Sequence, residues 1–496
     1  MVLTLIAIGG RGALPAKAAG PTVIDQDITT STTWIAADSP YQVSTNTVSV
    51  INGAVLTIEP GVTVEFQNDA RLQIQNGQLV AVGTPTQLIT FTPSSSSPVR
   101  GIWEGIVFAT DALTSSLEYA MIEYARGAIQ VSNNGKAPFS LQYNTIRYAG
   151  DNDGNLQTGG AIVGGPEDSM IAFNTIYSAE VGINLIRGAT HIITANQLYD
   201  IDGYCLGLVP SIGNNAANNT VANNRIYDCR NRGIFIEGLS SAAKGSGNIV
   251  TGNSITNTNG EGIYAVDQTL LQILGNTIRN TALTTTIGTT GTGSNIAAIA
   301  LVGVDPPNVQ NNQLLFNGGP GNYQGALYIT DTTSPLSIMS VQDNLIRGNT
   351  GNGVVFASAN NAPFQLINGN ALCVEGGGVE AANSHLTQGL SAAGNWWSTN
   401  TPASGSEYSG NVTVNPPIVL TGTATASAIP ADGSSTTDIV ITMNDGAGNT
   451  VPGPARVLSV TTNFGSVTPL VTLNANGVAT AILTAAAFPA TATITV

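Results

Sequence analysis

The sequence predicts an all-β chain in which a long parallel β-solenoid is followed by a small β-sandwich. Three observations support this prediction. An Asn-x-Ile/Leu motif recurs along the chain, the composition is poor in charge but rich in Gly and β-branched residues, and the pattern changes near Ile418. A disordered chain would carry more charge and fewer apolar residues than the 9 % and 42 % found here.

Residues 1–20 predict an export signal. Val2 to Ile8 form a short apolar run, and Ala16-Lys17-Ala18 has the small-x-small pattern of a cleavage site. The run is too short to span a bilayer, and we expect no transmembrane segment further on. Because the usual cationic start is absent, we expect the natural start to lie upstream. We therefore expect an exported bacterial protein, extracellular or at the cell surface.

The segment from Trp34 to Phe108 predicts short strands separated by Gly turns. Inward and outward residues alternate in VSVINGAVLTIEPGVTVEF, which runs from Val48 to Phe66. A solenoid needs a cap, because an open end exposes unpaired strand edges. We interpret this segment as the cap and first coils of a β-helix domain that spans residues 21–398.

The central part is a repeat in which Asn is followed two residues later by Ile or Leu. Many copies precede a Gly and a short apolar strand, such as Gly233-Ile234-Phe235-Ile236. Spacings of 22 to 36 residues fit one solenoid coil with loops of variable length. We expect the Asn side chains to stack at a corner and the aliphatic side chains to stack inside. The copies begin at Asn144, Asn174, Asn196, Asn224, Asn253, Asn276, Asn312, Asn344 and Asn370.

The repeat ends near Gly394-Asn395-Trp396-Trp397, and we expect the two Trp to plug the last coil. Residues 399–417 are rich in Ser, Thr, Gly and Pro and predict a linker. Residues 418–496 show alternating strands interrupted by Asp-Gly and Gly-Asn turns, which predicts a small sandwich. The sequence stops inside a predicted strand, so we expect this domain to be truncated and further modules to follow.

The charge and the cysteine content exclude several classes of protein. A net charge of −15 lacks the cationic footprint of a nucleic-acid-binding protein and disfavours direct contact with anionic membranes. Three Cys are too few for a disulfide scaffold. Because Cys205 and Cys229 occupy different positions of the repeat, we expect buried free thiols rather than a bond between them.

The repeats resemble those of the pectate-lyase-like superfamily, which implies a right-handed parallel β-helix over roughly residues 34–400. The stretch from Gly53 to Val62 is similar to the opening of many secreted bacterial β-helix proteins, and Asn395-Trp396-Trp397 resembles their closing motif. The C-terminal part resembles bacterial immunoglobulin-like domains of the invasin/intimin type. The matching residues are Ala431-Asp432-Gly433, Val440-Ile441-Thr442, Asp445, Gly448-Asn449, Val451-Pro452 and Asn476-Gly477-Val478-Ala479.

Catalytic motifs known in relatives of this superfamily are missing. The resemblance implies Asn-Thr-Asp, Asp-Asp and Gly-His-Gly motifs for a galacturonase, an Asp-Pro-His motif for an epimerase and Pro-linked Arg motifs for a pectate lyase. None of these occurs. With only His191 and His385 in the chain, a His-based site is poorly supplied.

Alignment of the coils on their Asn residues predicts one charged face. Its residues are Glu180, Asp200, Asp202, Asp228, Arg230, Arg232 and Glu261. The simpler interpretation is a solvated corner with compensating Asp–Arg pairs, which stabilise little. The alternatives are a ligand-binding surface formed by Glu180, Asp202, Arg230, Arg232 and Glu261, or catalysis by Asp200, Asp202, Asp228 and Arg230.

Two further features are candidates for binding. Asp151, Asp153 and Asn155 alternate as oxygen ligands in a short loop, so Ca²⁺ is the one candidate ion, although an Asx-rich turn explains the same pattern. Tyrosines cluster near the predicted corners, where they either pack at edges or contact sugar rings. The positions are Tyr119, Tyr124, Tyr143, Tyr148, Tyr177, Tyr199, Tyr204 and Tyr227.

Two functional hypotheses follow from the sequence. The first is an extracellular or cell-surface protein that is adhesive, structural or glycan-binding and has no identifiable catalytic motif. The second is a polysaccharide lyase or glycoside hydrolase that uses the Asp/Arg face of the β-helix. The expected partner is a polysaccharide or a cell-surface glycan in both.

Overall fold

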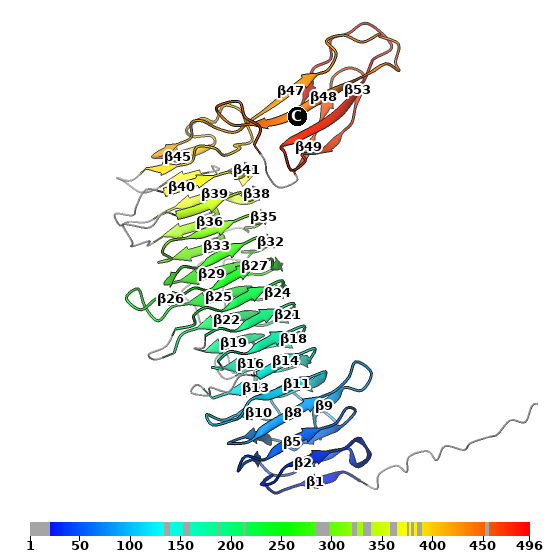
Figure 1. The fold of residues 1–496 in the computed structure, drawn as a ribbon, viewed down its shortest axis with the longest axis vertical. Coiled ribbons are helices and arrows are strands. Elements are labelled where there is room, and N and C mark those ends of the chain that lie inside the picture. Colours follow the sequence, from blue (N-terminus) through cyan, green and yellow to red (C-terminus); the bar gives the residue numbers. More distant parts are fainter. Residues whose placement is uncertain are drawn as a thin grey trace, which may run out of the picture.

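The computed structural model is an elongated rod of stacked coils with a small domain at its C-terminal end (Figure 1). It describes residues 20–132, 139–151, 159–165, 167–186, 189–211, 215–283, 297–319, 325–330, 339–357, 365–373, 376–377, 381–383, 389–451 and 456–496. The predicted export signal lies outside these ranges except for Gly20. Within them, no helix is long and apolar enough to cross a membrane.

The rod is a right-handed parallel β-helix, as predicted, with three long parallel sheets that we name A, B and C. Each coil visits sheet C, then A, then B. Sheet A contains β1 (Thr22–Ile24), β3 (Tyr41–Val43), β6 (Thr63–Phe66), β9 (Ile89–Pro93), β12 (Ala120–Glu123), β15 (Thr145–Arg147), β18 (Thr175–Ala179), β21 (Gln197–Ile201), β24 (Arg225–Cys229), β28 (Ser254–Thr256), β32 (Thr277–Arg279), β35 (Gln313–Leu315), β38 (Leu345–Arg347) and β41 (Ala371–Cys373).

The other two sheets run alongside sheet A. Sheet B contains β4 (Thr47–Val50), β7 (Arg71–Ile74), β10 (Gly105–Phe108), β13 (Gly127–Val131), β16 (Gly160–Gly164), β19 (Ile183–Ile186), β22 (Leu206–Val209), β25 (Ile234–Glu237), β29 (Ile263–Val266), β33 (Ala297–Val302), β36 (Gly325–Thr330), β39 (Thr350–Phe356), β43 (Ala381–Asn383) and β45 (Tyr408–Gly410), with β42 (Gly376–Gly377) paired to β39. Sheet C contains β2 (Thr32–Trp34), β5 (Val55–Ile58), β8 (Gln78–Val82), β11 (Ser115–Glu118), β14 (Phe139–Gln142), β17 (Met170–Ala172), β20 (Ile192–Thr194), β23 (Thr220–Ala222), β27 (Ile249–Thr251), β31 (Gln272–Leu274), β34 (Asn308–Gln310), β37 (Met339–Gln342), β40 (Gln365–Asn368), β44 (Leu390–Ser391) and β46 (Val412–Thr413). A short pair, β26 (Gly245–Ser246) and β30 (Gln268–Thr269), and a 3₁₀ turn, η1 (Ala36–Asp38), lie outside these sheets.

Aliphatic side chains form columns inside the rod. In sheet A the strand register places Ile146, Ile176, Leu198, Ile226 and Ile255 above one another, and all five are fully buried. Strands such as β5, β6 and β7, one from each sheet, alternate buried and half-buried residues, so the inward face of each sheet is apolar. Burial of one such side chain stabilises the fold by roughly 1.5–3 kcal/mol.

The predicted Asn column is present at the turn from sheet C to sheet A. Each side-chain amide donates to the Oδ1 atom of the Asn one coil further on, over distances of 2.9 to 3.0 Å. Each amide also donates to a backbone carbonyl inside the turn, as Asn224 does to Ile193 at 2.9 Å. The column continues through Asn276, Asn312, Asn344 and Asn370 to Asn395.

The expectation of free thiols at Cys205 and Cys229 was wrong. The two residues form a disulfide with a Cα–Cα distance of 5.8 Å. Cys229 ends β24 and Cys205 precedes β22 in the coil before, so the two side chains meet inside the turn between sheets A and B. Their different positions in the repeat are what bring them together. Cys373 forms no disulfide among the described residues.

The parallel pairing extends into the predicted linker, because β45 joins sheet B and β46 joins sheet C. The two Trp residues have different roles. Trp397 is fully buried in the core of the rod, whereas Trp396 packs partly against the core of the C-terminal domain.

The C-terminal domain consists of small antiparallel sheets around a core of its own that includes Ile439, Ile441 and Ala481. A four-stranded sheet has the order β47 (Val419–Ala424), β48 (Thr436–Asn444), β53 (Val478–Thr484) and β51 (Ser466–Val467). Two further pairs are β49 (Val457–Ser459) with β52 (Leu470–Thr472), and β50 (Thr461–Thr462) with β54 (Ile494–Thr495).

Side chains at the boundary tie this domain to the rod. Arg456 donates from Nη2 to the carbonyl oxygen of Gly369 at 3.2 Å, and its Nη1 lies 3.7 Å from Sδ of Met443. Burial lowers the pKa of Arg456, while Cys373 and Asp343 on the rod oppose that effect.

Candidate functional site

The predicted charged residues divide into three groups at the turn between sheets A and B. The register of β18, β21 and β24 aligns Ala179, Ile201 and Cys229, so the residues that follow them form a column. That column is Glu180, Asp202 and Arg230. A neighbouring column contains Asp200 and Asp228, and the pair Arg232 and Glu261 lies at the entrance to sheet B.

Asp202 is neutralised by two arginines. Arg230 Nη1 lies 2.8 Å from Oδ1, and Arg100 Nη1 lies 2.5 Å from Oδ2 of Asp202. Arg100 comes from the loop between β9 and β10 and also donates to the carbonyl of Ser178 at 2.8 Å. No spacing rule of the repeat predicts this contact, because the loop crosses several coils.

Glu180 is buried, with 4 % of its surface exposed, and its Oε2 atom accepts a hydrogen bond from the Asp151 amide at 3.0 Å. Asp151 Oδ2 lies 3.3 Å from Arg126 Nε, and Arg126 also pairs with Glu104 at 2.5 Å. Asp151 therefore belongs to a network of ion pairs. Asp153 and Asn155 lie outside the described residues, and the Ca²⁺ site remains a prediction.

Arg232 and Glu261 form a buried ion pair in which Nε and Oε2 are 3.0 Å apart. Their side chains are 5 % and 0 % exposed. The guanidinium also lies 4.2 Å from the ring centroid of Tyr264 and 5.1 Å from that of Phe235. This pair, which the sequence predicts as part of a ligand-binding surface, is enclosed by protein.

Asp200 and Asp228 are both exposed, and so is Arg230. Asp200 accepts a hydrogen bond from Ser178 Oγ at 2.7 Å, and Asp228 accepts one from Asn257 Nδ2 at 3.3 Å. Both have left-handed backbone angles at the edge of sheet A, with φ of 52° and 55°. Their carboxylates face solvent beside the outer face of that sheet.

A stack of three tyrosines covers the outer face of sheet A next to these carboxylates. The ring centroids of Tyr177, Tyr199 and Tyr227 are 5.0 and 4.9 Å apart, with interplanar angles of 6° and 1°. The register of β18, β21 and β24 produces this stack, because it aligns the three residues directly. Their faces cover one another, so the ring edges and hydroxyl groups point outward.

The hydroxyl groups of the stack differ in their partners. Arg147 donates to Tyr177 Oη at 3.3 Å, and Gln197 donates to Tyr227 Oη at 2.7 Å. Tyr199 Oη has no hydrogen-bond partner among the described residues. Burial raises the pKa of Tyr199, and Tyr227 and Tyr177 add to the rise, so this hydroxyl stays protonated at neutral pH and can donate.

We name this surface the tyrosine face and define it as Tyr177, Tyr199, Tyr227, Arg225, Asp200 and Asp228. The guanidinium of Arg225 lies over the ring of Tyr227, 4.9 Å from the centroid. The face combines aromatic edges, an open hydroxyl, two carboxylates and a cation within three successive coils.

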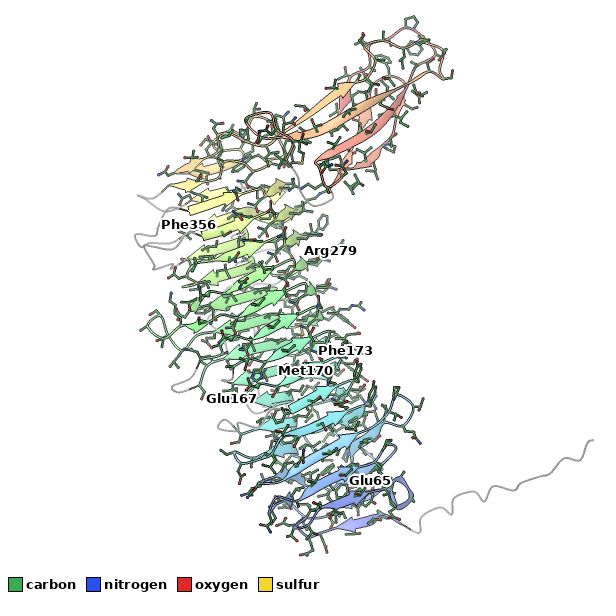
Figure 2. All side chains as sticks on the ribbon, viewed as in Figure 1. Glu65, Glu167, Met170, Phe173, Arg279 and Phe356 are labelled. Atoms are coloured by element: carbon green, nitrogen blue, oxygen red, sulfur yellow. A yellow bond between two sulfur atoms is a disulfide. The ribbon has the colours of Figure 1, made fainter. Side chains whose placement is uncertain are left out.

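Two more aromatic columns border sheet A. Tyr119, Tyr143 and Phe173 stack at the turn from sheet C, with centroids 4.7 and 4.8 Å apart, and Tyr124 and Tyr148 stack at the turn to sheet B. Phe173 is 47 % exposed and lies at the edge of the rod in Figure 2. Tyr204 belongs to none of these columns. It is buried, and its ring centroid lies 5.8 Å from that of Phe235 on sheet B.

Two family models match parts of the chain. One, described as a right handed beta helix region, matches residues 104–278. The other, described as a pectate-lyase like beta helix domain, matches residues 26–159. A curated relative, the protein bark beetle of Drosophila melanogaster, is 48 % identical over 61 residues, which cover 12 % of this chain. The chain spans only 2 % of the length of that relative.

Several solved structures have a distant likeness to the chain. The A-module of the mannuronan C-5 epimerase AlgE4 from Azotobacter vinelandii is 12 % identical, with a TM-score of 0.36, over 66 % of this chain and 89 % of that one. The catalytic domain of Agl-KA is 15 % identical, with a TM-score of 0.39, over 73 % and 62 %. The Dettilon tailspike protein is 12 % identical, with a TM-score of 0.32, over 90 % and 85 %. The assignment of the fold stands on the strand pairing and the family models.

Proposed function

We propose that this chain is an exported β-helix protein that binds a polysaccharide along the tyrosine face. The observation that supports it best is Tyr199, which presents an open hydroxyl between two stacked rings and beside the carboxylate of Asp200. Sugar recognition requires apolar surface for the C–H groups and fixed polar groups for the hydroxyls. The tyrosine face offers both.

The charge of the chain favours a neutral polysaccharide over an anionic one. A net charge of −15 repels polyanions at a distance. Asp200 and Asp228 would accept hydrogen bonds from sugar hydroxyls, whereas they would repel uronate carboxylates. Arg225 adds a donor at the same surface.

Export is supported by the disulfide between Cys205 and Cys229, because such bonds form in oxidising compartments and are rare in the reducing cytosol. We further propose that the antiparallel C-terminal domain is an immunoglobulin-like module of the kind found in bacterial surface proteins. Together these points favour an adhesive or structural protein at the cell surface.

Catalysis has weaker support than binding. A glycoside hydrolase needs one carboxyl group that stays protonated and a second that is free to act as base or nucleophile. Asp202 is held by Arg100 and Arg230, and Glu261 is enclosed with Arg232. Asp200 and Asp228 remain available, so the lyase or hydrolase alternative needs an assay of its own.

The test of binding is a glycan array with purified protein and two variants of Tyr199. Tyr199→Phe keeps the ring stack but removes the open hydroxyl, so we expect binding to weaken roughly fivefold, equivalent to about 1 kcal/mol. Tyr199→Ala also removes the ring, and we expect a loss of about tenfold or more. Tyr328→Ala is the matched control, because Tyr328 lies on sheet B.

Full binding by Tyr199→Ala, or loss of binding in Tyr328→Ala, would place the ligand elsewhere. The catalytic alternative is tested by measuring new reducing ends and unsaturated products on a panel of polysaccharides. Turnover that disappears in Asp202→Ala or Asp200→Asn would replace binding with catalysis as the function of this face.

A further inference from the structure

The column of tyrosines on sheet A continues toward the C-terminal end of the rod. The register of β24, β28 and β32 places Tyr227 beside Thr256 and Thr256 beside Arg279. Ile255 and Ile278, the residues between which these side chains alternate, are fully buried, so Thr256 and Arg279 point outward. Figure 1 shows β21, β24 and β32 one above another, and Figure 2 shows Arg279 near the edge of the rod. The tyrosine face is therefore one part of a longer outward column.

Arg279 repeats the pairing of a guanidinium with an aromatic ring. Its guanidinium lies over the ring of Phe316, 5.2 Å from the centroid. Phe316 follows β35 in the next coil and is 44 % exposed. Gly348 packs under this ring from the coil after that, because a Cβ at Gly348 would lie 2.5 Å from Phe316 Cδ1. The same arrangement, Arg225 over Tyr227, is found two strands earlier in sheet A.

The two guanidinium groups are held by rings and not by carboxylates. In the described part of the chain, the side chains of Arg225 and Arg279 make no hydrogen bond and no ion pair. Carboxylates are plentiful in a chain with 30 acidic and 15 basic residues, yet β28, β32 and β35 contain none. A guanidinium packed on a ring keeps its N–H donors in one plane, so it can donate to a ligand at a low cost in side-chain entropy. The cations that do pair with carboxylates are Arg100, Arg126, Arg147, Arg230, Arg232 and Lys244.

The spacing of these groups favours a ligand that is long and straight. Tyr199 on β21 and Phe316 after β35 are four strand spacings apart, with β24, β28 and β32 between them, which is about 19 Å along the rod. Ser254, Thr256 and Thr277 supply hydroxyl groups between the two arginine–ring pairs. A polysaccharide that coils would leave this column after a few residues. A β-1,4-linked chain of neutral sugars is extended, and each of its residues is about as long as one strand spacing.

We propose that Arg279 and Phe316 form a second subsite for the polysaccharide that the tyrosine face binds. The ligand is then a neutral, extended, β-1,4-linked chain that contacts sheet A from Tyr199 to Phe316. This second subsite presupposes the proposed function, because one sugar chain must occupy both places. Binding at the first place makes binding at the second intramolecular, so affinity rises with the length of the chain.

The experiment compares cellobiose with cellohexaose, which are neutral and β-1,4-linked, by calorimetric titration of the full chain. The parent protein should bind cellohexaose about tenfold or more tightly than cellobiose. The double variant Arg279→Ala/Phe316→Ala should lose about fivefold or more in affinity for cellohexaose and keep its affinity for cellobiose. A longer sugar also has more ways to occupy the tyrosine face alone, and that part of the gain should persist in the variant.

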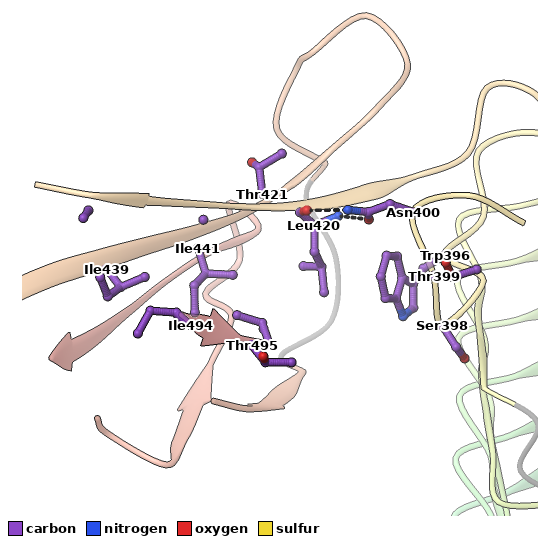
Figure 3. A pocket seen from close by; sticks show the side chains of 13 residues that line it. Trp396, Ser398, Thr399, Asn400, Leu420, Thr421, Ile439, Ile441, Ile494 and Thr495 are labelled. Carbon is purple, nitrogen blue, oxygen red and sulfur yellow. Dashed lines mark hydrogen bonds between the residues drawn. The ribbon is translucent and has the colours of Figure 1, made fainter. Parts of the chain in front are cut away.

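Two control variants remove other aromatic rings. Phe173 matches Phe316 in exposure, at 47 %, and in backbone angle, with φ of 58° against 55°, but it lies at the opposite corner of sheet A. Trp396 lines a cleft of about 520 Å³ between the last coils and the C-terminal domain (Figure 3). Phe173→Ala and Trp396→Ala should bind both sugars like the parent protein. Unfolding temperatures check that every variant is folded.

The outcomes separate the second subsite from the first. Equal affinity of the parent for the two sugars, with loss of both in Tyr199→Ala, would overturn the second subsite and leave the proposed function in place. Unchanged binding of cellohexaose by Arg279→Ala/Phe316→Ala, or an equal loss in Phe173→Ala or Trp396→Ala, would also overturn it. Absence of binding of either sugar by the parent would reject the β-1,4-linked ligand, while the glycan array would still decide the proposed function.

Discussion

Arg100 and Asp202 are 102 residues apart in the sequence and form an ion pair that fastens the loop after β9 to the turn after β21. This contact runs along the rod, whereas the backbone hydrogen bonds of the sheets join only adjacent coils. It also connects the loop to Arg230 through the same carboxylate. The loop therefore restrains several coils at once.

Replacement of Arg100 by Ala is expected to lower the free energy of unfolding by about 1 kcal/mol. The effect is modest because both side chains are partly solvated and Arg230 still pairs with Asp202. Urea denaturation of Arg100→Ala, Arg230→Ala and the double variant measures the coupling. Strict additivity of the two losses would show that the arginines do not share the carboxylate.

Loss of one partner of the buried pair Arg232 and Glu261 should be far more damaging. Arg232→Leu leaves the Glu261 carboxyl group enclosed without its ion-pair partner, and we expect a loss of about 3–5 kcal/mol. The double variant Arg232→Leu/Glu261→Leu removes both charges and should recover most of that stability. Denaturation midpoints compare the three proteins, and a double variant less stable than either single one would contradict this explanation.

The Asn column should tolerate no apolar replacement at its centre. Asn224→Leu removes the acceptor for the Asn196 amide and the donor to Asn253, and it leaves their polar atoms buried. We expect destabilisation of about 1–3 kcal/mol. Thermal unfolding measures it, with Asn223→Gly as the neighbouring control, since Asn223 is exposed in the same turn and its φ of 55° suits Gly. Equal effects at the two positions would argue against a specific role of the column.

The disulfide should stabilise the rod and leave one cysteine outside the bond. Reduction, or a Cys205→Ala/Cys229→Ala variant, opens a loop of 24 residues, which predicts a loss of about 3 kcal/mol. Thiol titration of the unfolded, unreduced protein should detect only Cys373 among the three cysteines. Detection of three thiols in protein isolated from an oxidising compartment would disprove the bond.

Asp343 should make the stability of the rod depend on pH. Desolvation raises the pKa of Asp343 above its ordinary value of 3.8, and Arg456 only partly opposes it. The folded state therefore holds this proton more tightly than the unfolded state. Stability should fall as the pH rises from 3.8 through the folded pKa, and Asp343→Asn should flatten that slope. Unfolding temperatures at a series of pH values test it, and an identical slope in Asp343→Asn would reject this assignment.

The sequence predicted the parts of this molecule that repeat. The Asn motif predicted the position of the turn from sheet C to sheet A. The column of Glu180, Asp202 and Arg230 was predicted from their equal spacing after each Asn. Contacts that break the repeat were not predictable in this way. Arg100 reaches Asp202 through an irregular loop, and Cys205 meets Cys229 because residues at different repeat positions face each other inside one turn.

The candidate site was predicted only in part, for a similar reason. The sequence analysis assigned Arg232, Glu261, Asp200 and Asp228 to one charged face. In the structure Arg232 and Glu261 are buried, whereas the two Asp residues are exposed. Burial depends on neighbouring loops and rings, which no spacing rule contains. The tyrosines were noted near the corners, but their stacking required the register of β18, β21 and β24.

The turn that houses the Asn column always contains two residues from β14 to β41, whereas the connections at the other two corners vary widely in length. An insertion between sheets C and A would break a continuous chain of amides, so lengthening is confined to the other corners. Those corners are the sites at which this scaffold could acquire new recognition segments, or accept grafted ones, without disturbing its interior.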